Sequence, residues 1–430
     1  MNETVIRKET YGLIVFNPRI NGYYRVYDNK LQQEILNKNF NYIKQNYKTE
    51  FYELGLDIEN KRYVDNSIFG NEVFVPLEAY FDYTALCNRN CAYCYNKKFL
   101  GNTTMTEESV RHVFDSFYEL GIMRVHLAGG EPTINYLGLK NYIEYGRSKG
   151  MRISLATNGT FLDDNKISEL LTTNDLISVS VSLDNADPKK NDGLRGDGSF
   201  EKVLEGVKNL KEHKKKNNSN LEICYKPVYF PTITNNEIES LIKMAEKYGL
   251  DKVKFANPER CDEHELGYYG SQKKLYYDSI KRIQNIIERG NYKVSITNVT
   301  NPALYDFIIG IEENRGCIGA QELITINPDG RITPCLMNHY KLGNIYDYSD
   351  LKEFLTISDK LKKYRKMISS YNCNNCKNHF SCRGGCQVRK KVEYGAIKNN
   401  DPLCPKNLCE EKEQKVLKKN IRKINVYHSL

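Results

Sequence analysis

The chain has 430 residues, of which 40% are hydrophobic and 27% are charged, and its formal net charge at pH 7 is +9. This length predicts two or three domains, the composition is that of a globular protein, and so mild a basic bias does not indicate a nucleic-acid partner. No run of about 18 apolar residues is present and Met1–Thr10 lacks the apolar core of a signal peptide, so we expect a cytoplasmic protein without a membrane partner.

Residues 1–75 are predicted to form a small α+β module with a winged-helix-like order of elements. Two short strands are expected at Gly12–Phe16 and Tyr23–Tyr27, joined by a turn that contains Pro, Asn and Gly. An amphipathic helix is expected at Leu31–Tyr47, because apolar residues recur there at helical spacing.

Residues 76–256 alternate strands with helices, which predicts an α/β fold with a parallel sheet built from βα units. Strands are expected at Pro76–Tyr83, Arg124–Ala128, Arg152–Thr157, Ile177–Leu183, Leu221–Tyr229 and Lys252–Ala256. Helices are expected at Glu107–Leu120, Phe200–Lys214 and Asn236–Tyr248. Six such units predict a partial (β/α)6 TIM-like barrel, with its chemistry at the carboxyl ends of the strands.

The rest of the chain is predicted to contain three further segments. Residues 257–316 form a linker or bridging region with one helix at Lys273–Arg289. Residues 317–410 form a cysteine-rich, loop-rich domain, in which strands Leu323–Asn327 and Arg331–Pro334 flank a hairpin turn. Residues 411–430 form a charged C-terminal tail, with a helix expected at Glu410–Asn425.

The cysteine pattern is the most specific feature of the sequence. Thirteen cysteines in a cytosolic chain indicate metal ligation or redox chemistry and not disulfides. Three of them lie between Cys87 and Cys94, and seven lie between Cys317 and Cys404. Cys224 and Cys261 stand alone, and we expect both to be small buried apolar side chains.

Cys87, Cys91 and Cys94 follow directly after the first barrel strand. Three thiolates on one loop can bind three irons of a [4Fe–4S] cluster and leave the fourth iron open. A zinc site is the alternative, but zinc prefers a fourth ligand, and Tyr95–Leu100 offers none.

This C-x3-C-x2-C spacing, with Tyr93 inside it, resembles the motif of the radical S-adenosylmethionine (SAM) superfamily. Further motifs follow the next three strands in the superfamily's order, and their residues are Gly129, Gly130, Glu131, Pro132, Asn158, Ser182, Asp184 and Arg195. The resemblance implies that these residues and Tyr93 surround SAM, which Cys87, Cys91 and Cys94 bind through their cluster. It also implies that the Gly-Gly-Glu-Pro segment receives the SAM amino group and that Arg195 pairs with the SAM carboxylate.

The later cysteines resemble those of the SPASM domain, an extension found in radical SAM enzymes that mature peptides and proteins. The resemblance implies two auxiliary [4Fe–4S] clusters, hence three in all. The distal cluster would take Cys373, Cys376, Cys382 and Cys404, and the proximal cluster would take Cys317, Cys335 and Cys386. Some relatives have one more cysteine where this chain has Ile311, so the proximal cluster has an open iron, or Cys409 or Cys261 completes it. A zinc ribbon is the alternative for the C-terminal quartet.

The resemblance implies reductive cleavage of SAM to a 5′-deoxyadenosyl radical, which removes hydrogen from a ribosomally made precursor peptide. The N-terminal module resembles the element with which peptide maturases bind a leader by adding it to a sheet edge. We therefore expect a small precursor peptide with a leader as substrate, a thioether crosslink as product, and flavodoxin or ferredoxin as reductant.

Three alternatives remain open at this point. Epimerisation or carbon–carbon crosslinking would use the same apparatus. Formylglycine formation, as in anaerobic sulfatase maturases, is less expected. Those enzymes have an Asp that acts as the catalytic base directly after the second SPASM cysteine, whereas here Leu336 follows Cys335. A non-catalytic iron–sulfur electron carrier would not need the residues assigned to SAM.

Overall fold

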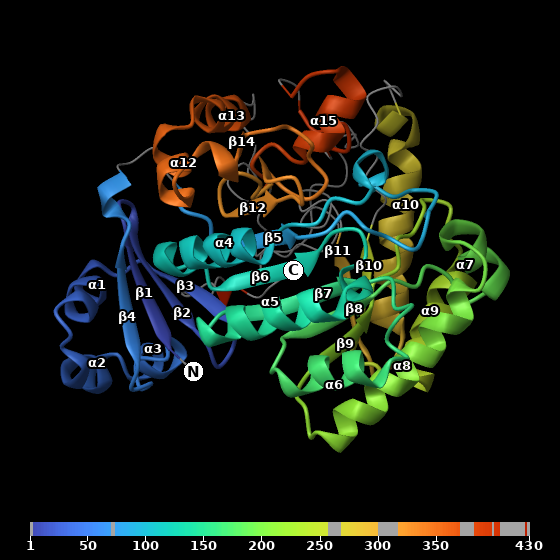
Figure 1. Ribbon diagram of the computed structural model, residues 1–430, viewed down its shortest axis with the longest axis horizontal. Helices are drawn as coiled ribbons and strands as arrows, with labels where there is room; N and C mark the ends of the chain where they lie inside the picture. Colours follow the sequence, from blue (N-terminus) through green and yellow to red (C-terminus); the bar gives the residue numbers. More distant parts are fainter. Residues whose placement is uncertain are drawn as a thin grey trace.

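The computed structural model describes residues 3–69, 74–256, 268–299, 317–369, 382–397, 400–404 and 426–427. Its strands form two sheets, one of five strands in the order β15-β3-β2-β1-β4 and one of ten in the order β11-β10-β9-β8-β7-β6-β5-β12-β13-β14. The five-stranded sheet lies at one end of the molecule, beside the larger sheet and its covering helices (Figure 1). No helix in the described ranges has the length and apolar character needed to cross a membrane.

The N-terminal module contains both expected strands and two that the sequence analysis missed. Its elements are β1 (Thr4–Glu9), β2 (Gly12–Asn17), β3 (Gly22–Val26), α1 (Asn29–Leu36), α2 (Phe40–Asn46), α3 (Lys48–Glu53) and β4 (Lys61–Asp65). The single helix expected at Leu31–Tyr47 is wrong: Lys38 has a φ of 60° and separates α1 from α2. Asparagines on both sides of Lys38 favour a helix end over a helix interior.

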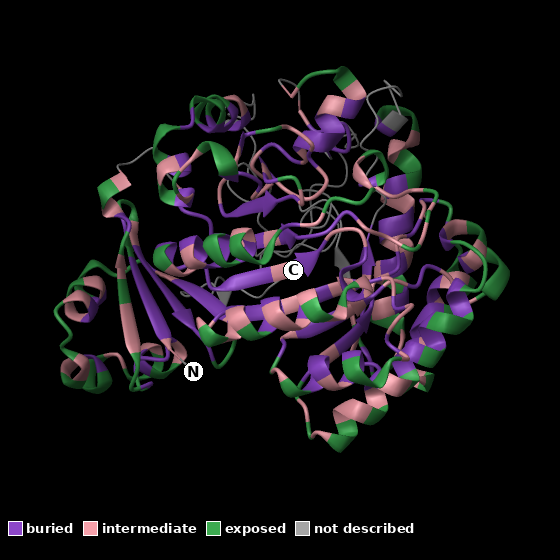
Figure 2. Ribbon diagram, in the orientation of Figure 1, coloured by how far each residue is buried: buried purple, intermediate pink, exposed green. Residues whose placement is uncertain are grey.

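The six expected barrel strands are confirmed as parallel neighbours in the larger sheet. They are β5 (Glu78–Asp82), β6 (Arg124–Ala128), β7 (Arg152–Thr157), β8 (Ser178–Val181), β9 (Glu222–Tyr225) and β10 (Lys252–Ala256). A seventh parallel strand, β11 (Ser295–Val299), extends the sheet from within the segment expected to be a linker. Most of these strands are buried, whereas the outer helices keep exposed faces (Figure 2).

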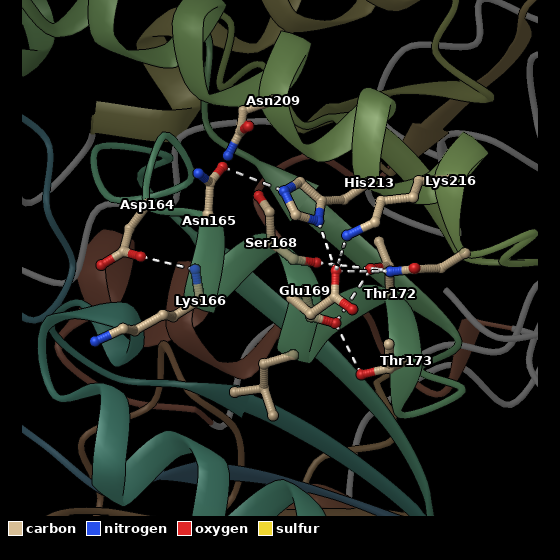
Figure 3. A network of polar contacts seen from close by, with 12 residues as sticks. Asp164, Asn165, Lys166, Ser168, Glu169, Thr172, Thr173, Asn209, His213 and Lys216 are labelled. Carbon is tan, nitrogen blue, oxygen red and sulfur yellow. Dashed lines mark hydrogen bonds and ion pairs between the residues drawn. The ribbon is translucent and has the colours of Figure 1, made fainter.

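Helices cover the outer face of these strands. They are α4 (Glu107–Leu120), α5 (Tyr136–Ser148), α6 (Asn165–Thr173), α7 (Pro188–Arg195), α8 (Ser199–Lys216), α9 (Asn235–Lys247) and α10 (Tyr268–Arg289). The four expected helices are confirmed, whereas α5, α6 and α7 were missed. Figure 3 shows a polar network between α6 and α8, in which Glu169 binds His213 Nδ1 at 2.8 Å and Asn165 lies 3.2 Å from His213 Nε2. These contacts fix one helix against the other.

The C-terminal segment adds strands to the barrel sheet. Its elements are β12 (Leu323–Ile326), β13 (Arg331–Thr333), β14 (Gly343–Asn344), α12 (Leu351–Ile357), α13 (Asp359–Ser369) and α15 (Gln387–Tyr394). The expected hairpin is observed as β12 and β13, and β12 also pairs in parallel with β5. At the end of the chain, β15 (Val426–Tyr427) pairs with β3, and the helix expected at Glu410–Asn425 lies outside the described residues.

Candidate active site and cluster-binding residues

The loop that carries Cys87, Cys91 and Cys94 begins after β5. All three cysteines are free and half-buried. Burial raises the pKa of Cys87 to about 11, and it also raises the pKa of Cys91 and of Cys94. Thiols in such surroundings are neutral at pH 7, and binding to iron would replace their protons. The loop therefore offers three sulfur ligands, as a [4Fe–4S] cluster with an open iron requires.

Two glycines dock the end of β6 onto the chain that leads into this loop. A Cβ at Gly130 would lie 2.1 Å from the carbonyl oxygen of Leu86, and a Cβ at Gly129 would lie 2.5 Å from that of Thr84. The backbone of Gly130 donates to the Thr84 carbonyl at 2.8 Å, and that of Glu131 donates to Leu86 at 2.7 Å. The glycines thus allow a close approach of backbone to backbone, and they position Cys87.

Glu131 is fully buried, and the chain itself binds its carboxylate. Oε1 accepts hydrogen bonds from the Thr133 amide at 3.0 Å, the Thr133 hydroxyl at 2.5 Å and the Thr157 hydroxyl at 2.7 Å. Oε2 accepts from the Asn158 amide at 2.6 Å. Burial raises the pKa of Glu131, and these hydrogen bonds act against that rise. The Glu131 carboxylate therefore joins the ends of β6 and β7, and its contact with SAM stays a prediction.

Asn158 continues this connection to the cysteine loop. Its side-chain amide donates to Asn88 Oδ1 at 2.8 Å, and its Oδ1 accepts from the Thr160 amide at 2.9 Å. Arg89, next to Asn88, reaches the same turn, because its Nε donates to the Thr160 hydroxyl at 3.2 Å. Asn88 and Arg89 were not expected to have positioning roles, because they occupy positions between Cys87 and Cys91 that the C-x3-C spacing leaves unspecified.

A triad of half-buried Tyr93 with buried Asp184 and Arg195 joins the cysteine loop to the end of β8. The Tyr93 hydroxyl donates to Asp184 Oδ2. The Arg195 guanidinium lies 2.9 Å from Asp184 Oδ1 through Nη2 and 2.7 Å from Oδ2 through Nε. Although burial opposes it, the charges of Asp184 and Tyr93 raise the pKa of Arg195. The Arg195 guanidinium thus contacts both carboxylate oxygens of Asp184, and its pairing with a SAM carboxylate stays a prediction.

The expected site residues therefore meet at one edge of the sheet. Ser182 is half-buried there, and its amide donates to the Thr157 carbonyl at 3.0 Å. Pro132 is the first residue of a buried turn, and its carbonyl oxygen accepts a hydrogen bond from the Tyr83 hydroxyl. The structure thus brings together the carboxyl ends of β5 to β8 around the cysteine loop, where ligands of parallel sheets bind.

The interior of the barrel contains polar side chains that were not predicted from the sequence. His126 lies 2.5 Å from the Ser154 hydroxyl and 3.1 Å from Glu78 Oε2, and Tyr80 stacks on it with ring centroids 4.8 Å apart. On the opposite wall, Lys254 lies 3.1 Å from Glu222. Alternation of polar and apolar residues along each strand was the available signal.

Three of the proposed auxiliary ligands act electrostatically on one phenol, that of Tyr364. Burial, and then the charges of Cys317, Cys335 and Cys386, raise the pKa of Tyr364, which is 1% exposed. Asn338 donates to the Tyr364 hydroxyl at 2.8 Å. Cys382 is half-buried and Cys404 is buried. The positions expected to complete the clusters lie outside the described residues: Cys373, Cys376, Cys261, Ile311 and Cys409.

Comparisons with known proteins agree with this geometry. The model of the radical SAM superfamily matches residues 82–245, and the model of the SPASM iron–sulfur cluster-binding domain matches residues 317–378. The mycofactocin maturase MftC of Mycolicibacterium smegmatis is 20% identical over 337 residues, which cover 76% of this chain and 82% of MftC. The antilisterial bacteriocin subtilosin biosynthesis protein AlbA of Bacillus subtilis is 24% identical over 388 residues, which cover 85% of this chain and 80% of AlbA.

Solved structures share the fold. Crystal structures of Streptococcus suis SuiB, bound to S-adenosylmethionine and to the precursor peptide SuiA, superpose with TM-scores of 0.70 and 0.69 at 18% and 17% identity. Each superposition covers 93% of this chain and 98% of the SuiB chain. The cofactors that these domains imply are SAM, a SAM-binding [4Fe–4S] cluster and auxiliary clusters, and the three thiols of the loop fit the first cluster. The chain thus contains a radical SAM domain, matched over residues 82–245, and a SPASM domain, matched over residues 317–378.

Proposed function

We propose that this enzyme modifies a ribosomally made precursor peptide and joins a cysteine sulfur to a carbon of that peptide in a thioether. The observation that carries the proposal is the N-terminal five-stranded sheet, which the radical chemistry itself does not require. The relatives support a peptide substrate, since one is named a maturase, one serves bacteriocin biosynthesis, and SuiB binds a precursor peptide.

The N-terminal sheet is fixed to the barrel through buried polar contacts. Arg7 is fully buried and donates to the carbonyls of Pro76 at 2.9 Å and Val75 at 3.1 Å. Tyr23 accepts from the Met123 amide at 2.7 Å. Buried hydrogen bonds of this kind hold a defined orientation, so a peptide bound to the sheet would enter the barrel from a fixed direction.

The sheet edge expected to bind a leader, in the strands around Gly12–Tyr27, is already paired with another strand. β2 lies inside the sheet, and the outer edge of β3 pairs with β15. The other outer strand is β4, whose edge borders a crevice of about 260 Å³ lined also by residues of α4 and by Asp350 and Lys352. A leader strand would displace β15 from β3, the edge that the resemblance indicates.

Within the barrel, the chain's own groups would orient the peptide and the cofactor. The cofactors, when bound, supply a hydrogen-atom acceptor and an electron acceptor. Thioether formation breaks one C–H and one S–H bond, makes one C–S bond, and releases a hydrogen atom, a proton and an electron. Exclusion of water around the reacting carbon, once the peptide and the cofactors are bound, would protect a carbon radical from side reactions.

The test uses anaerobically reconstituted enzyme, dithionite, SAM and candidate precursor peptides encoded beside the gene. A thioether predicts loss of two hydrogen atoms from the peptide and loss of one thiol that iodoacetamide can alkylate. A carbon–carbon crosslink would give the same mass change with all thiols kept. Epimerisation would leave the mass unchanged in ordinary water, but in deuterated water it would incorporate deuterium. An unchanged peptide beside rapid SAM cleavage would contradict the proposal.

A formylglycine product is the weaker candidate. The sulfatase maturases have an Asp that acts as the catalytic base directly after the second SPASM cysteine. Here Leu336 follows Cys335, so this chain has no carboxylate at that position. The same mass measurement decides, because conversion of cysteine to formylglycine removes the sulfur.

A further inference from the structure

Asp401 lies between two cysteines that belong to different proposed cluster sites. Its Oδ2 accepts from the backbone amide of Cys386 at 2.6 Å. Its Oδ1 accepts from the amide of Leu403 at 2.9 Å, and its carbonyl accepts from the amide of Cys404 at 2.8 Å. One residue thus fixes the backbone of both cysteines.

Arg389 forms a buried ion pair with Asp401. Arg389 donates to Asp401 Oδ2 from Nη2 at 2.8 Å and to Oδ1 from Nε at 3.1 Å. The two side chains are 2% and 1% exposed, so water screens this pair weakly. Gly385 makes room for the contact, because a Cβ there would lie 2.3 Å from Asp401 Oδ2, and its φ of +79° disfavours other residues.

We propose that Asp401 is a positioning residue shared by the two auxiliary clusters, which holds Cys386 for the proximal one and Cys404 for the distal one and, with Arg389, sets the charge that both clusters experience. The proposal rests on the assignment of these cysteines as ligands. Iron analysis of Cys386→Ser and Cys404→Ser tests that assignment by itself.

The decisive experiment is a redox titration followed by electron paramagnetic resonance on the anaerobically reconstituted full chain. Cluster potentials depend on nearby charge and hydrogen bonds. Asp401→Asn removes one negative charge beside Cys386 and Cys404, so both auxiliary potentials should become more positive, while that of the SAM-binding cluster stays unchanged. Arg389→Gln should shift both auxiliary potentials the other way, and the double variant should return them close to the wild-type values.

Gly385→Ala keeps every charge but pushes Asp401 away. We expect it to lose iron from both auxiliary clusters, about eight of roughly twelve irons per chain, and to keep the SAM-binding cluster. Glu9→Gln is the matched control, because Arg7 and Glu9 form another buried pair, 2.6 Å apart and 0% and 1% exposed. It should change neither iron content nor potentials. A response of one auxiliary cluster alone, or of neither, would overturn the proposal.

Discussion

Asp184 and Arg195 form a buried ion pair whose two contacts measure 2.9 and 2.7 Å, with side chains 0% and 8% exposed. Asp184 also accepts from the Val228 amide at 2.8 Å and from the Tyr93 hydroxyl. The pair therefore holds the cysteine loop, the end of β8 and the chain after β9 in one arrangement.

Asp184→Asn should destabilise the protein strongly. It leaves the Arg195 guanidinium buried without its counter-charge, and such losses cost about 3 to 5 kcal/mol. Chemical denaturation measures the change. Glu144→Gln is the control: it breaks an exposed pair with Lys140, with side chains 45% and 41% exposed, and should cost no more than about 0.5 kcal/mol. Equal effects of the two variants would contradict this reading of the triad.

Substitution of Cys87, Cys91 and Cys94 together by alanine should remove about four of roughly twelve irons and abolish 5′-deoxyadenosine formation. Iron analysis and chromatography of the reaction measure both. Cys224→Ala serves as the control, since Cys224 is fully buried and its sulfur lies 3.2 Å from the Ser180 hydroxyl. It should keep all irons. Zinc in place of iron would contradict the cluster assignment.

Gly130→Ala should disturb the cysteine loop without touching a cysteine. The new methyl group would lie 2.1 Å from the Leu86 carbonyl oxygen, and a backbone atom cannot move as a flexible side chain can. Overpacking of this kind costs about 1 to 3 kcal/mol. We expect impaired reconstitution of the SAM-binding cluster, seen as lost iron. Gly193→Ala in α7 is the control, because its Cβ would meet no atom within 4 Å; iron loss there too would argue against the explanation.

The stability of α9 should depend on pH through Glu237. Although burial acts the other way, hydrogen bonds from Lys190, from the amide and hydroxyl of Thr234 and from Asn185 lower the pKa of Glu237 from 4.5 to about 2. A carboxylate with a lowered pKa stabilises the fold above pH 4.5, and this contribution is lost as the pH falls toward 2. Glu237→Gln should cost about 1 kcal/mol at pH 7, measured by denaturation. A cost that did not shrink between pH 4.5 and pH 2 would contradict this role.

Removal of residues 425–430 should expose the edge of β3. β15 pairs with Tyr23 and Tyr24 of β3, so its loss should speed amide hydrogen exchange in Gly22–Val26 and leave β1 unchanged. A candidate precursor peptide should then bind more tightly, since it no longer competes with β15. Unchanged exchange in β3 would show that β15 does not protect this edge.

The barrel strands and the positions of the motifs could be predicted, because apolar runs and turn residues are local signals. Strand β1 was missed because charged residues such as Arg7 and Glu9 are usually exposed. In the structure both side chains are buried, and they form an ion pair with Nη2 and Oε1 2.6 Å apart. The hydrogen bonds from Thr157 and Asn158 to the Glu131 carboxylate were also missed. These residues are far apart in the sequence, and short sequence motifs do not show which distant residues folding brings into contact. The same limit applies to Asp401, which looks like an ordinary turn residue in the sequence.

The pairing of β12 with β5 affects how enzymes of this kind could exchange parts. β5 leads into the cysteine loop, and it lies between β6 and β12 in one continuous sheet. A chimera joined just before Cys317 would keep the radical SAM core of one parent but would take a strand of its sheet from the other. The register between Ile324 and Ala79 would then decide whether the cysteine loop keeps its place. The unit that can be recombined is therefore the core together with β12, and substrate modules must be exchanged outside it.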